Sequence, residues 1–286
     1  MVNTVAGLSL IAKVVVTGYL SGATKSIRVG PGMEFSQYRG YEPGDDLRLL
    51  DWKMVARSGR HYIKQSDRES QLNVTFVLDT SNSMAHTENG LSKIDHARTL
   101  IAVLAYLAQK QGDTVQLYAL NEEEFKSLRT KPGKTAFQRL LLQLLQLDVN
   151  AKWPDSATAA KKMQAKGGAE LVFFITDLYE REQELTTFAK GLKSPRNEVM
   201  ILQLMGKSEM EFDHSANITF QDLETGDKVK VNAKEARKAY LEQMERATER
   251  NKMEFLGQGI GYKRFRMDED LATVLPLFLK VRNKLR

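Results

Sequence analysis

The 286-residue chain contains no cysteine, and only four of its residues are histidines. The lack of cysteine excludes disulfide bonds, thiolate zinc sites and a cysteine nucleophile, and it fits a reducing compartment. The histidines stand in no metal-ligand or catalytic-triad pattern; they are His61, His86, His96 and His214. Long apolar runs are also missing, because no segment reaches the roughly 20 apolar residues that span a bilayer. We therefore expect a cytoplasmic protein without a membrane span, and we do not predict an enzyme.

The chain also lacks a strong excess of one charge. It has 42 Lys and Arg and 36 Asp and Glu, which gives a formal net charge of +6. The basic residues lie in small separate clusters without interleaved aromatics, at 161–162, 263–264 and 280–286. This pattern favours a solvated surface over nucleic-acid binding. A complete phosphate-binding loop is missing as well. Gly-Lys-Thr at 133–135 precedes a helical pattern, but Leu128 stands where that loop requires glycine.

Strand and helix patterns alternate from residue 73 onward. The apolar runs 73–78 and 171–176 are typical of strands buried on both faces, and 92–111 and 137–147 have amphipathic helical spacing. This alternation predicts an α/β fold with a doubly wound, mostly parallel sheet. Further strands are expected at 114–120, 125–129, 198–204 and within 253–265, and further helices at 155–164, 182–192, 233–250 and after a capping Asp268.

Segments on both sides of this core predict a small β-rich side lobe. The amphipathic pattern at 5–20 predicts a helix that packs on the outside of the main domain. A glycine-rich, extended stretch follows it, and a hairpin is expected at 212–231. We expect the hairpin to pair with the N-terminal extended segment. The predicted division is 1–70 for the N-terminal helix and side-lobe segment, 71–206 for the core, 207–232 for the hairpin and 233–286 for the elements that complete the core.

The segment Arg39 to Trp52 concentrates acidic residues that could be mistaken for a catalytic cluster. No base, nucleophile or phosphate loop accompanies these acids, so a structural role is the better interpretation. We expect them to cap turns and to pair with neighbouring arginines. The acids are Asp45, Asp46 and Asp51, and the arginines are Arg39, Arg48 and Arg57.

Polar side chains follow the buried strand at 73–78. Asp79-x-Ser81-x-Ser83 places one carboxylate and two hydroxyls on one loop, at the sheet edge where open α/β sheets bind ligands. These are hard oxygen ligands of the kind that suits Mg²⁺. The alternative is a strand that ends in an Asx or Ser turn, with Ser83 capping the next helix. A second buried strand also ends in an acid, Asp177, and two such strands can place both carboxylates around one cation.

The spacing of several motifs resembles a known family. The motifs are Gly30-x-Gly32-x-Glu34-Phe35, the segment Arg39 to Trp52, Ala56-Arg57 and Leu78-Asp79-Thr80-Ser81-x-Ser83-Met84. Together they are similar to the bacterial domain-of-unknown-function 58 family, whose members carry a von Willebrand factor A-like domain. Thr24-Lys25 departs from the family, which often has a His-Arg pair there. The Asp-x-Ser-x-Ser motif itself resembles the metal-ion-dependent adhesion site (MIDAS) of A-type domains.

The resemblance implies a set of ligands and a partner. Ser81, Ser83 and a second-loop threonine would hold Mg²⁺ or another hard divalent cation such as Mn²⁺, with Asp79 and Asp177 bound directly or through water. Thr135 fits the second-loop position, although Thr130 is close enough to be the alternative. A-domains have Asp-Gly where this chain has Asp177-Leu178. An open coordination position would accept a partner's carboxylate. Related proteins work with MoxR-type AAA+ ATPases, as adaptor or co-chaperone.

A different function class stays open from the sequence. The same acids, Asp79 and Asp177, could serve a metal-dependent hydrolase or phosphotransferase. That chemistry would need a general base or a second metal close to Asp79, and the sequence offers no obvious candidate for either. The favoured prediction is therefore a metal-dependent protein-binding module.

Overall fold

The computed structural model describes residues 2–23, 35–43, 45, 47, 50–66, 71–162, 170–180, 183–212, 217–221 and 228–285. The chain divides into two compact units. Unit 1 comprises Met1–Tyr19 and Gln71–Arg286, and unit 2 comprises Leu20–Ser70. Each unit is described by itself below.

Unit 1 is built on a six-stranded sheet with the order β12-β9-β8-β3-β6-β7. All neighbouring strands are parallel except the edge pair β6–β7, which is antiparallel. The strands are β3 (Asn73–Asp79), β6 (Thr114–Leu120), β7 (Phe125–Thr130), β8 (Glu170–Thr176), β9 (Asn197–Met205) and β12 (Gly261–Arg266). The order runs outward in both directions from β3, so the predicted doubly wound, mostly parallel sheet is confirmed.

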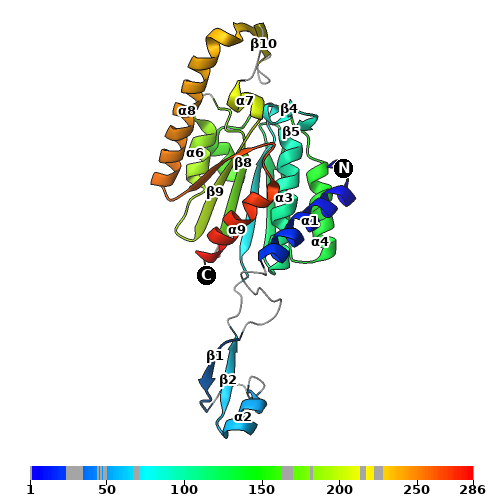
Figure 1. The fold of residues 1–286 in the computed structure, drawn as a ribbon, viewed down its shortest axis with the longest axis vertical. Coiled ribbons are helices and arrows are strands. Elements are labelled where there is room, and N and C mark those ends of the chain that lie inside the picture. The colour runs from blue at the N-terminus through cyan, green and yellow to red at the C-terminus, as the bar shows by residue number, and fades with distance from the viewer. Residues whose placement is uncertain are drawn as a thin grey trace. The chain divides into compact units, whose positions relative to one another are not determined.

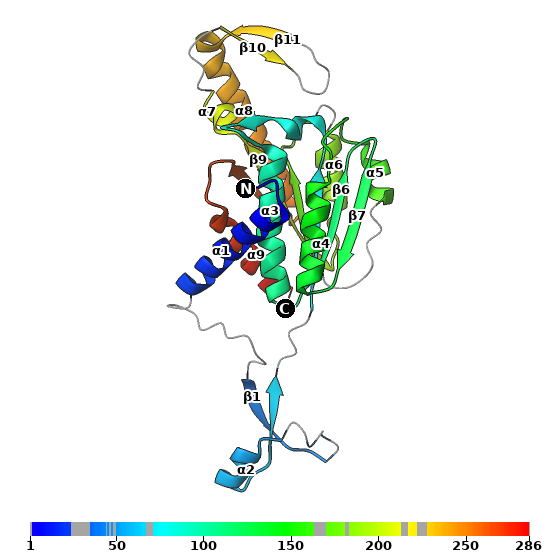
Figure 2. The ribbon, with the colours of Figure 1, turned by 90° about the vertical axis from the view of Figure 1, so that its right-hand side faces the viewer.

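Helices cover both faces of this sheet (Figures 1 and 2). On one face lie α3 (Lys93–Lys110), α4 (Lys134–Leu145) and α9 (Val274–Asn283). On the other lie α5 (Ser156–Lys162), α6 (Glu184–Gly191) and α8 (Ala233–Gly257). Aromatic side chains mark each layer. Phe173 of β8 stacks between Phe76 and Phe278 on the first face, whereas Trp153 and Phe188 pack around Phe174 on the second. Both faces of β8 are therefore core, as its unbroken apolar run requires.

The first helix, α1 (Val5–Ala23), crosses over α3 in both views (Figures 1 and 2). Its buried residues Leu8, Ala12 and Val16 recur every fourth position, which places them on one helical face. The window Val5–Gly22 is nevertheless long and apolar enough to cross a membrane by length and composition, and only 22% of it is buried. By these two criteria the expectation that no segment could span a membrane is wrong, although a core helix or a signal sequence can satisfy them too.

Short elements surround the carboxyl edge of the sheet. They are the 3-10 helix η2 (Asn82–Ala85), the hairpin β4 (Thr87–Glu88) with β5 (Leu91–Ser92), helix α7 (Lys207–Glu211) and the hairpin β10 (Asn217–Gln221) with β11 (Lys228–Asn232). The expected hairpin is present, but among the described strands β10 pairs with β11 and not with the N-terminal segment. The expected cap at Asp268 is also wrong. Asp270 caps the 3-10 helix η3 (Leu271–Thr273), while Asp268 pairs with Arg266.

Unit 2 contains the hairpin β1 (Phe35–Gly40) with β2 (Tyr62–Ser66) and helix α2 (Trp52–Ser58). Arg39 forms an ion pair with Asp45 across 2.6 Å, and Asp45 also accepts the amide of Glu42. Asp51 is buried and caps α2 by accepting the amides of Lys53 and Met54. The structural roles predicted for Asp45 and Asp51 are therefore confirmed. The predicted roles of Asp46 and Arg48 lie outside the described residues.

A buried ion pair fastens the last helix to the sheet. Arg282 of α9 donates two hydrogen bonds to Asp113, from Nε at 2.8 Å and from Nη2 at 3.0 Å. Both side chains are almost completely buried. Asp113 lies between α3 and β6, and it also accepts the amide of Leu72 just before β3. One carboxylate thus joins three segments that are distant in sequence.

We expect Arg282→Met to lower the free energy of unfolding by about 3 to 5 kcal/mol, because it leaves the Asp113 carboxylate buried without its partner. Lys280→Met, which removes the same charge from an exposed position of α9, should change stability by less than about 0.5 kcal/mol. Chemical denaturation of both variants measures this. Equal effects would show that the buried pair does not fasten α9.

Candidate divalent-cation site

Two buried carboxylates meet at the carboxyl edge of the sheet. β3 and β8 are parallel neighbours in which Leu78 is paired with Ile175, so Asp79 and Asp177 follow adjacent strands. Both acids are buried. The sheet therefore brings together the two residues that the sequence placed at strand ends.

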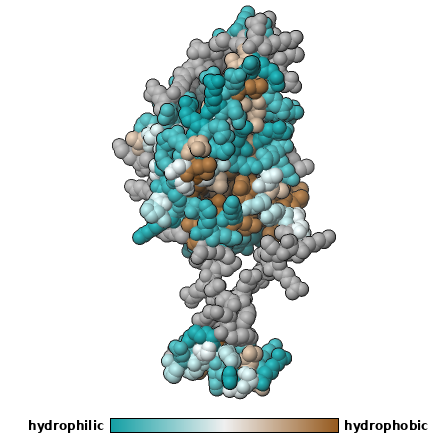
Figure 3. All heavy atoms as spheres, turned by 60° about the vertical axis from the view of Figure 1, so that its left-hand side comes forward, coloured by the Kyte–Doolittle hydropathy of each residue, from teal (hydrophilic) through white to brown (hydrophobic). Residues whose placement is uncertain are grey.

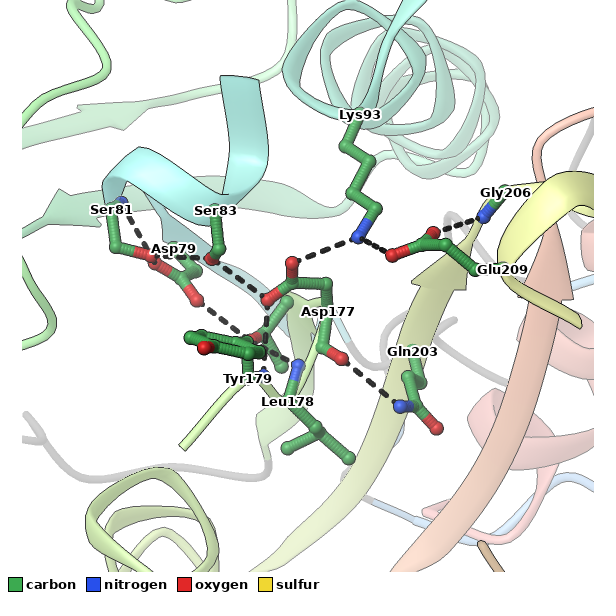
Figure 4. Close-up of polar contacts among 11 residues, drawn as sticks. Asp79, Ser81, Ser83, Lys93, Asp177, Leu178, Tyr179, Gln203, Gly206 and Glu209 are labelled. Carbon is green, nitrogen blue, oxygen red and sulfur yellow. Dashed lines mark hydrogen bonds and ion pairs between the residues drawn. The ribbon is translucent and has the colours of Figure 1, made fainter. Parts of the chain in front are cut away.

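A continuous row of oxygen atoms joins these carboxylates (Figure 4). Ser81 donates to Asp79 Oδ1 twice, from its amide at 2.9 Å and from its hydroxyl at 2.6 Å. The Ser81 and Ser83 hydroxyls lie 3.2 Å apart, and Ser83 Oγ donates to Asp177 Oδ1 across 3.0 Å. Alternate residues of the loop, Asp79, Ser81 and Ser83, thus present their side chains on one side, toward the end of β8.

The end of β8 supports this row through two residues next to Asp177. Thr176 donates its hydroxyl to Asp79 Oδ2 across 2.7 Å and accepts the amide of Leu178 at 3.0 Å. Leu178 has a φ of 54°, in the left-handed region that favours glycine. Leu178 therefore replaces the glycine of the Asp-Gly pattern but keeps the left-handed backbone conformation that glycine favours. The leucine side chain is only 7% exposed and packs in the core beneath α6, which offsets the conformational cost.

An internal ammonium group touches the second carboxylate. Lys93, the first residue of α3, donates to Asp177 Oδ2 at 3.0 Å and to Glu209 Oε1 of α7 at 2.8 Å. Figure 4 shows its side chain descending from α3 between these two acids. Glu209 also accepts the amide of Gly206 at 2.6 Å, where α7 begins. Lys93 therefore links the carboxyl edge of the sheet to α7.

The charges of this cluster do not balance. The carboxylates of Asp79, Asp177 and Glu209 share one ammonium group, that of Lys93, within the part of the chain that the structure describes. Burial, and then the neighbouring Asp177 charge, raise the pKa of Asp79 to about 7. Burial alone would lower the pKa of Lys93, but Asp177 and Glu209 outweigh it and raise that pKa. The site consequently carries surplus negative charge that a bound cation would neutralise.

The threonines expected from the second loop lie elsewhere. β7 runs antiparallel to β6, so Phe125 pairs with Leu120 at the site edge and Thr130 pairs with Val115 at the opposite edge. Thr130 donates its hydroxyl to the Val115 carbonyl. Thr135 is exposed at the start of α4, which follows β7 directly. Both threonines are therefore at the wrong end of the sheet, and their assignment to the site is corrected.

The segment after α4 is the one that returns to the site. The amide of Asn82 donates to the Ala151 carbonyl at 2.9 Å, and the amide of Asn150 donates to the Thr80 carbonyl at 3.2 Å. Asn121 fastens this contact, because its amide group donates to the Thr80 carbonyl and to Asn150 Oδ1. The loop from Asp79 to Ser83 is thus held from two sides, by β8 and by residues 150–151.

The sequence analysis did not predict three residues of the site. For two of them, the sequence contains a pattern that could have indicated a buried polar contact. Lys93 begins a helix, where the helix dipole disfavours a positive charge, so a lysine there needs a local acidic partner. Thr176 ends a buried strand directly after an apolar run, and a hydroxyl in that position indicates a buried acceptor. Glu209 had no comparable signal, because it comes from a five-residue helix whose position depends on the tertiary fold.

The donor set fits a small hard cation. Mg²⁺ binds six oxygens at 2.0–2.1 Å in an octahedron, which places neighbouring ligand oxygens about 2.9 Å apart. The spacings from Asp79 through Ser81 and Ser83 to Asp177 are 2.6, 3.2 and 3.0 Å. No group of three or more His, Asp or Glu among the described residues could hold a metal ion, so such a site would need the serine hydroxyls.

Known proteins with similarity to this chain are of two kinds. "Uncharacterized protein Rv1480" of Mycobacterium tuberculosis and "Uncharacterized protein Mb1516" of Mycobacterium bovis are each 24% identical over 235 residues, covering 77% of this chain and 69% of theirs. Among solved structures, conserved hypothetical protein BatB from Bacteroides thetaiotaomicron is 15% identical, with a TM-score of 0.44 over 74% of this chain and 99% of BatB. The SpRpn10 VWA domain is 11% identical, with a TM-score of 0.39 over 72% of this chain and 94% of that domain.

The family comparison covers the largest part of both units. A family model, described as "Protein of unknown function DUF58", matches residues 37–251. The match includes the Asp45–Asp51 segment of unit 2 and all the residues of the candidate site. The chain therefore belongs to the DUF58 family.

Proposed function

We propose that the chain is a protein-binding module whose interaction site contains a divalent cation. The observation that supports it best is the row of oxygens from Asp79 through Ser81 and Ser83 to Asp177, which brings hard oxygen donors within 3.2 Å of their neighbours and carries surplus negative charge. Ser81 and Ser83 would bind through their hydroxyls, and Asp79 and Asp177 directly or through water. Mg²⁺ is the expected ion, and Mn²⁺ suits the same donors.

The chemistry of such an ion suits recognition of an acidic residue. Neutral hydroxyl ligands leave a divalent cation with much of its positive charge, so an open coordination position attracts a carboxylate. Tyr179, two residues after Asp177 on the same loop, is 43% exposed, so this loop reaches the surface beside the ion. We infer that the partner presents an Asp or Glu to this edge of the sheet.

The kind of partner follows from the family resemblance. A MoxR-type AAA+ ATPase is the proposed partner, and the chain would act as its adaptor or co-chaperone toward a client protein. Hydroxyl and amide donors hold the carboxylate of Asp79 in place, from Ser81 on its own loop and from Thr176 at the end of β8. This arrangement favours binding over hydrolysis.

Asp79→Ala should abolish binding of Mg²⁺ and Mn²⁺ while the domain stays folded, because it removes the carboxylate at the start of the row. Calorimetric titration with each ion, together with a thermal melt, measures both properties. Asp148→Ala removes an exposed acid outside the site and serves as the control. Unchanged metal affinity in Asp79→Ala would contradict the site, and loss of folding would favour a purely structural turn.

The raised pKa of Asp79 predicts a pH-dependent stability in the metal-free protein. The ordinary pKa is 3.8 and the folded value is about 7, so the folded state binds a proton that the unfolded state has already lost between these pH values. Stability therefore falls as pH rises through this window, by about 2 to 4 kcal/mol. Asp79→Asn, which cannot ionise, should lack this part of the pH dependence. Denaturation curves from about pH 4 to about pH 8, the window set by these two values, measure the difference between the two proteins.

Added Mg²⁺ provides the check on that interpretation. It should restore stability to the wild-type protein above pH 7 and leave Asp79→Asn unaffected, because a bound ion compensates the Asp79 charge. Parallel pH profiles for the two proteins would show that Asp79 does not carry the surplus charge.

Binding of the ATPase should require both the ion and Asp79. Chelation of Mg²⁺ should weaken the complex as much as Asp79→Ala does, and the two losses should not add, because they delete one interaction. Ser81→Ala should have a partial effect, since water can replace one hydroxyl ligand. A titration of the two proteins in Mg²⁺ and in chelator measures this. Full-strength binding in chelator would place the partner elsewhere on the molecule.

A further inference from the structure

Two large side chains of helix α2 are exposed in unit 2. The structure accounts for Arg39, Asp45 and Asp51, because the first two form an ion pair and the third caps α2. Trp52 and Arg57 are placed differently, although Arg57, in the last turn of α2, also suits the helix dipole. Both side chains are exposed, and the exposed fraction of Trp52 is 65%.

These two residues lie on one face of α2. Trp52, Lys53, Ala56 and Arg57 are all exposed, and their spacing of one, four and five positions forms a single patch on a helix. Met54 and Val55, on the other side of α2, are half-buried. We call the exposed set the α2 face. It has an orientation fixed by the Asp51 cap at one end and by Gly59, at φ 65°, at the other.

The α2 face combines an aromatic side chain with positive charge. Lys53 and Arg57 lie one turn apart on the same side of Trp52, and Arg60 is exposed immediately after the helix ends. α2 contains no acidic residue, and the carboxylate of Asp51 is buried in its capping role. Leu47, 57% exposed, adds apolar surface in the same unit. The face of unit 2 that Figure 3 shows is mainly hydrophilic.

Exposed tryptophan and arginine are the residues that most often dominate binding energy at protein interfaces. An exposed tryptophan also leaves a large apolar area in water, which a partner would remove. The positive charges select the partner by complementarity. The α2 face and the residue after it supply three positive charges, fewer than the roughly 6–10 phosphate contacts of a strongly salt-dependent DNA-binding protein.

We propose that the α2 face docks an acidic segment of a partner protein, with Trp52 as the buried contact and Lys53, Arg57 and Arg60 as the charge partners. This surface is independent of the cation at Asp79, so it would give the chain a second point of attachment. Two attachment points on one chain raise the overall affinity through effective concentration.

Tryptophan fluorescence of the full chain tests the proposal, because the chain has two tryptophans in opposite environments. Trp52 is exposed, whereas Trp153 is only 6% exposed and buried among Phe174 and Phe188. The probe is a synthetic poly-glutamate peptide. Its binding should shift the Trp52 emission to the blue and protect it from iodide quenching. Trp52→Phe should abolish this response and leave the Trp153 emission.

Charge-reversal variants show whether the face itself binds the peptide. Arg57→Glu should weaken binding at least tenfold, and Lys53→Glu provides a second variant if the first unfolds. Lys238→Glu makes the same charge change at an exposed position of α8 and should have little effect. Asp79→Ala should leave peptide binding unchanged, which separates a failure here from a failure of the cation site.

Three results would overturn the proposal. If the emission of Trp52 in the free protein is already blue-shifted and protected from iodide, another part of the chain covers the face. If Lys238→Glu weakens binding as much as Arg57→Glu, the peptide responds only to net charge. If a duplex oligonucleotide binds more tightly than the peptide and with the same dependence on Trp52, the partner is a nucleic acid.

Discussion

Parallel pairing of β3 with β8 is the constraint on which the site depends. It brings Asp79 and Asp177, two buried acids, to the same point at the carboxyl edge of the sheet. Repulsion between them must be met by hydrogen bonds and positive charge, and the surrounding structure provides both. Ser81 and Ser83 bridge the carboxylates, and the ammonium of Lys93 neutralises one of them. The neutralisation is incomplete, which is the physical reason to propose a cation.

The ends of the strands were predictable from sequence, whereas their surroundings were not. Asp79 and Asp177 each come at the end of a largely apolar strand, and parallel strands bring such ends together. Thr135 was misplaced because the turn from β6 to β7 reverses the chain direction, so the next helix starts at the opposite edge. Lys93 contacts Glu209 across 116 positions of sequence, and no local pattern reports a contact of that range.

In unit 2, too, some features were predictable from the sequence and others were not. Its acids were recognisable as structural residues, because they occur without a nucleophile or base and close to turn-forming residues. The structure gives Asp51 the cap of α2 and Asp45 the ion pair with Arg39. The exposure of Trp52 was not predictable, since a tryptophan inside a family pattern is more often a core residue. Only the helical phase of α2 shows which side of the segment is free.

The hydrogen bonds of the loop from Asp79 to Ser83 have a consequence for how a ligand would be sensed. The amides of Thr80, Ser81 and Asn82 are all bonded, to Leu120, Asp79 and Ala151, so the backbone is rigid before any ion arrives. A preorganised loop loses little conformational entropy on binding. What must change is the direction of the serine hydroxyl hydrogens, which point at carboxylates and would have to turn away from a cation. Occupancy would then alter the electrostatic potential of this edge while its shape stays the same, and a partner would recognise charge and not a moved loop.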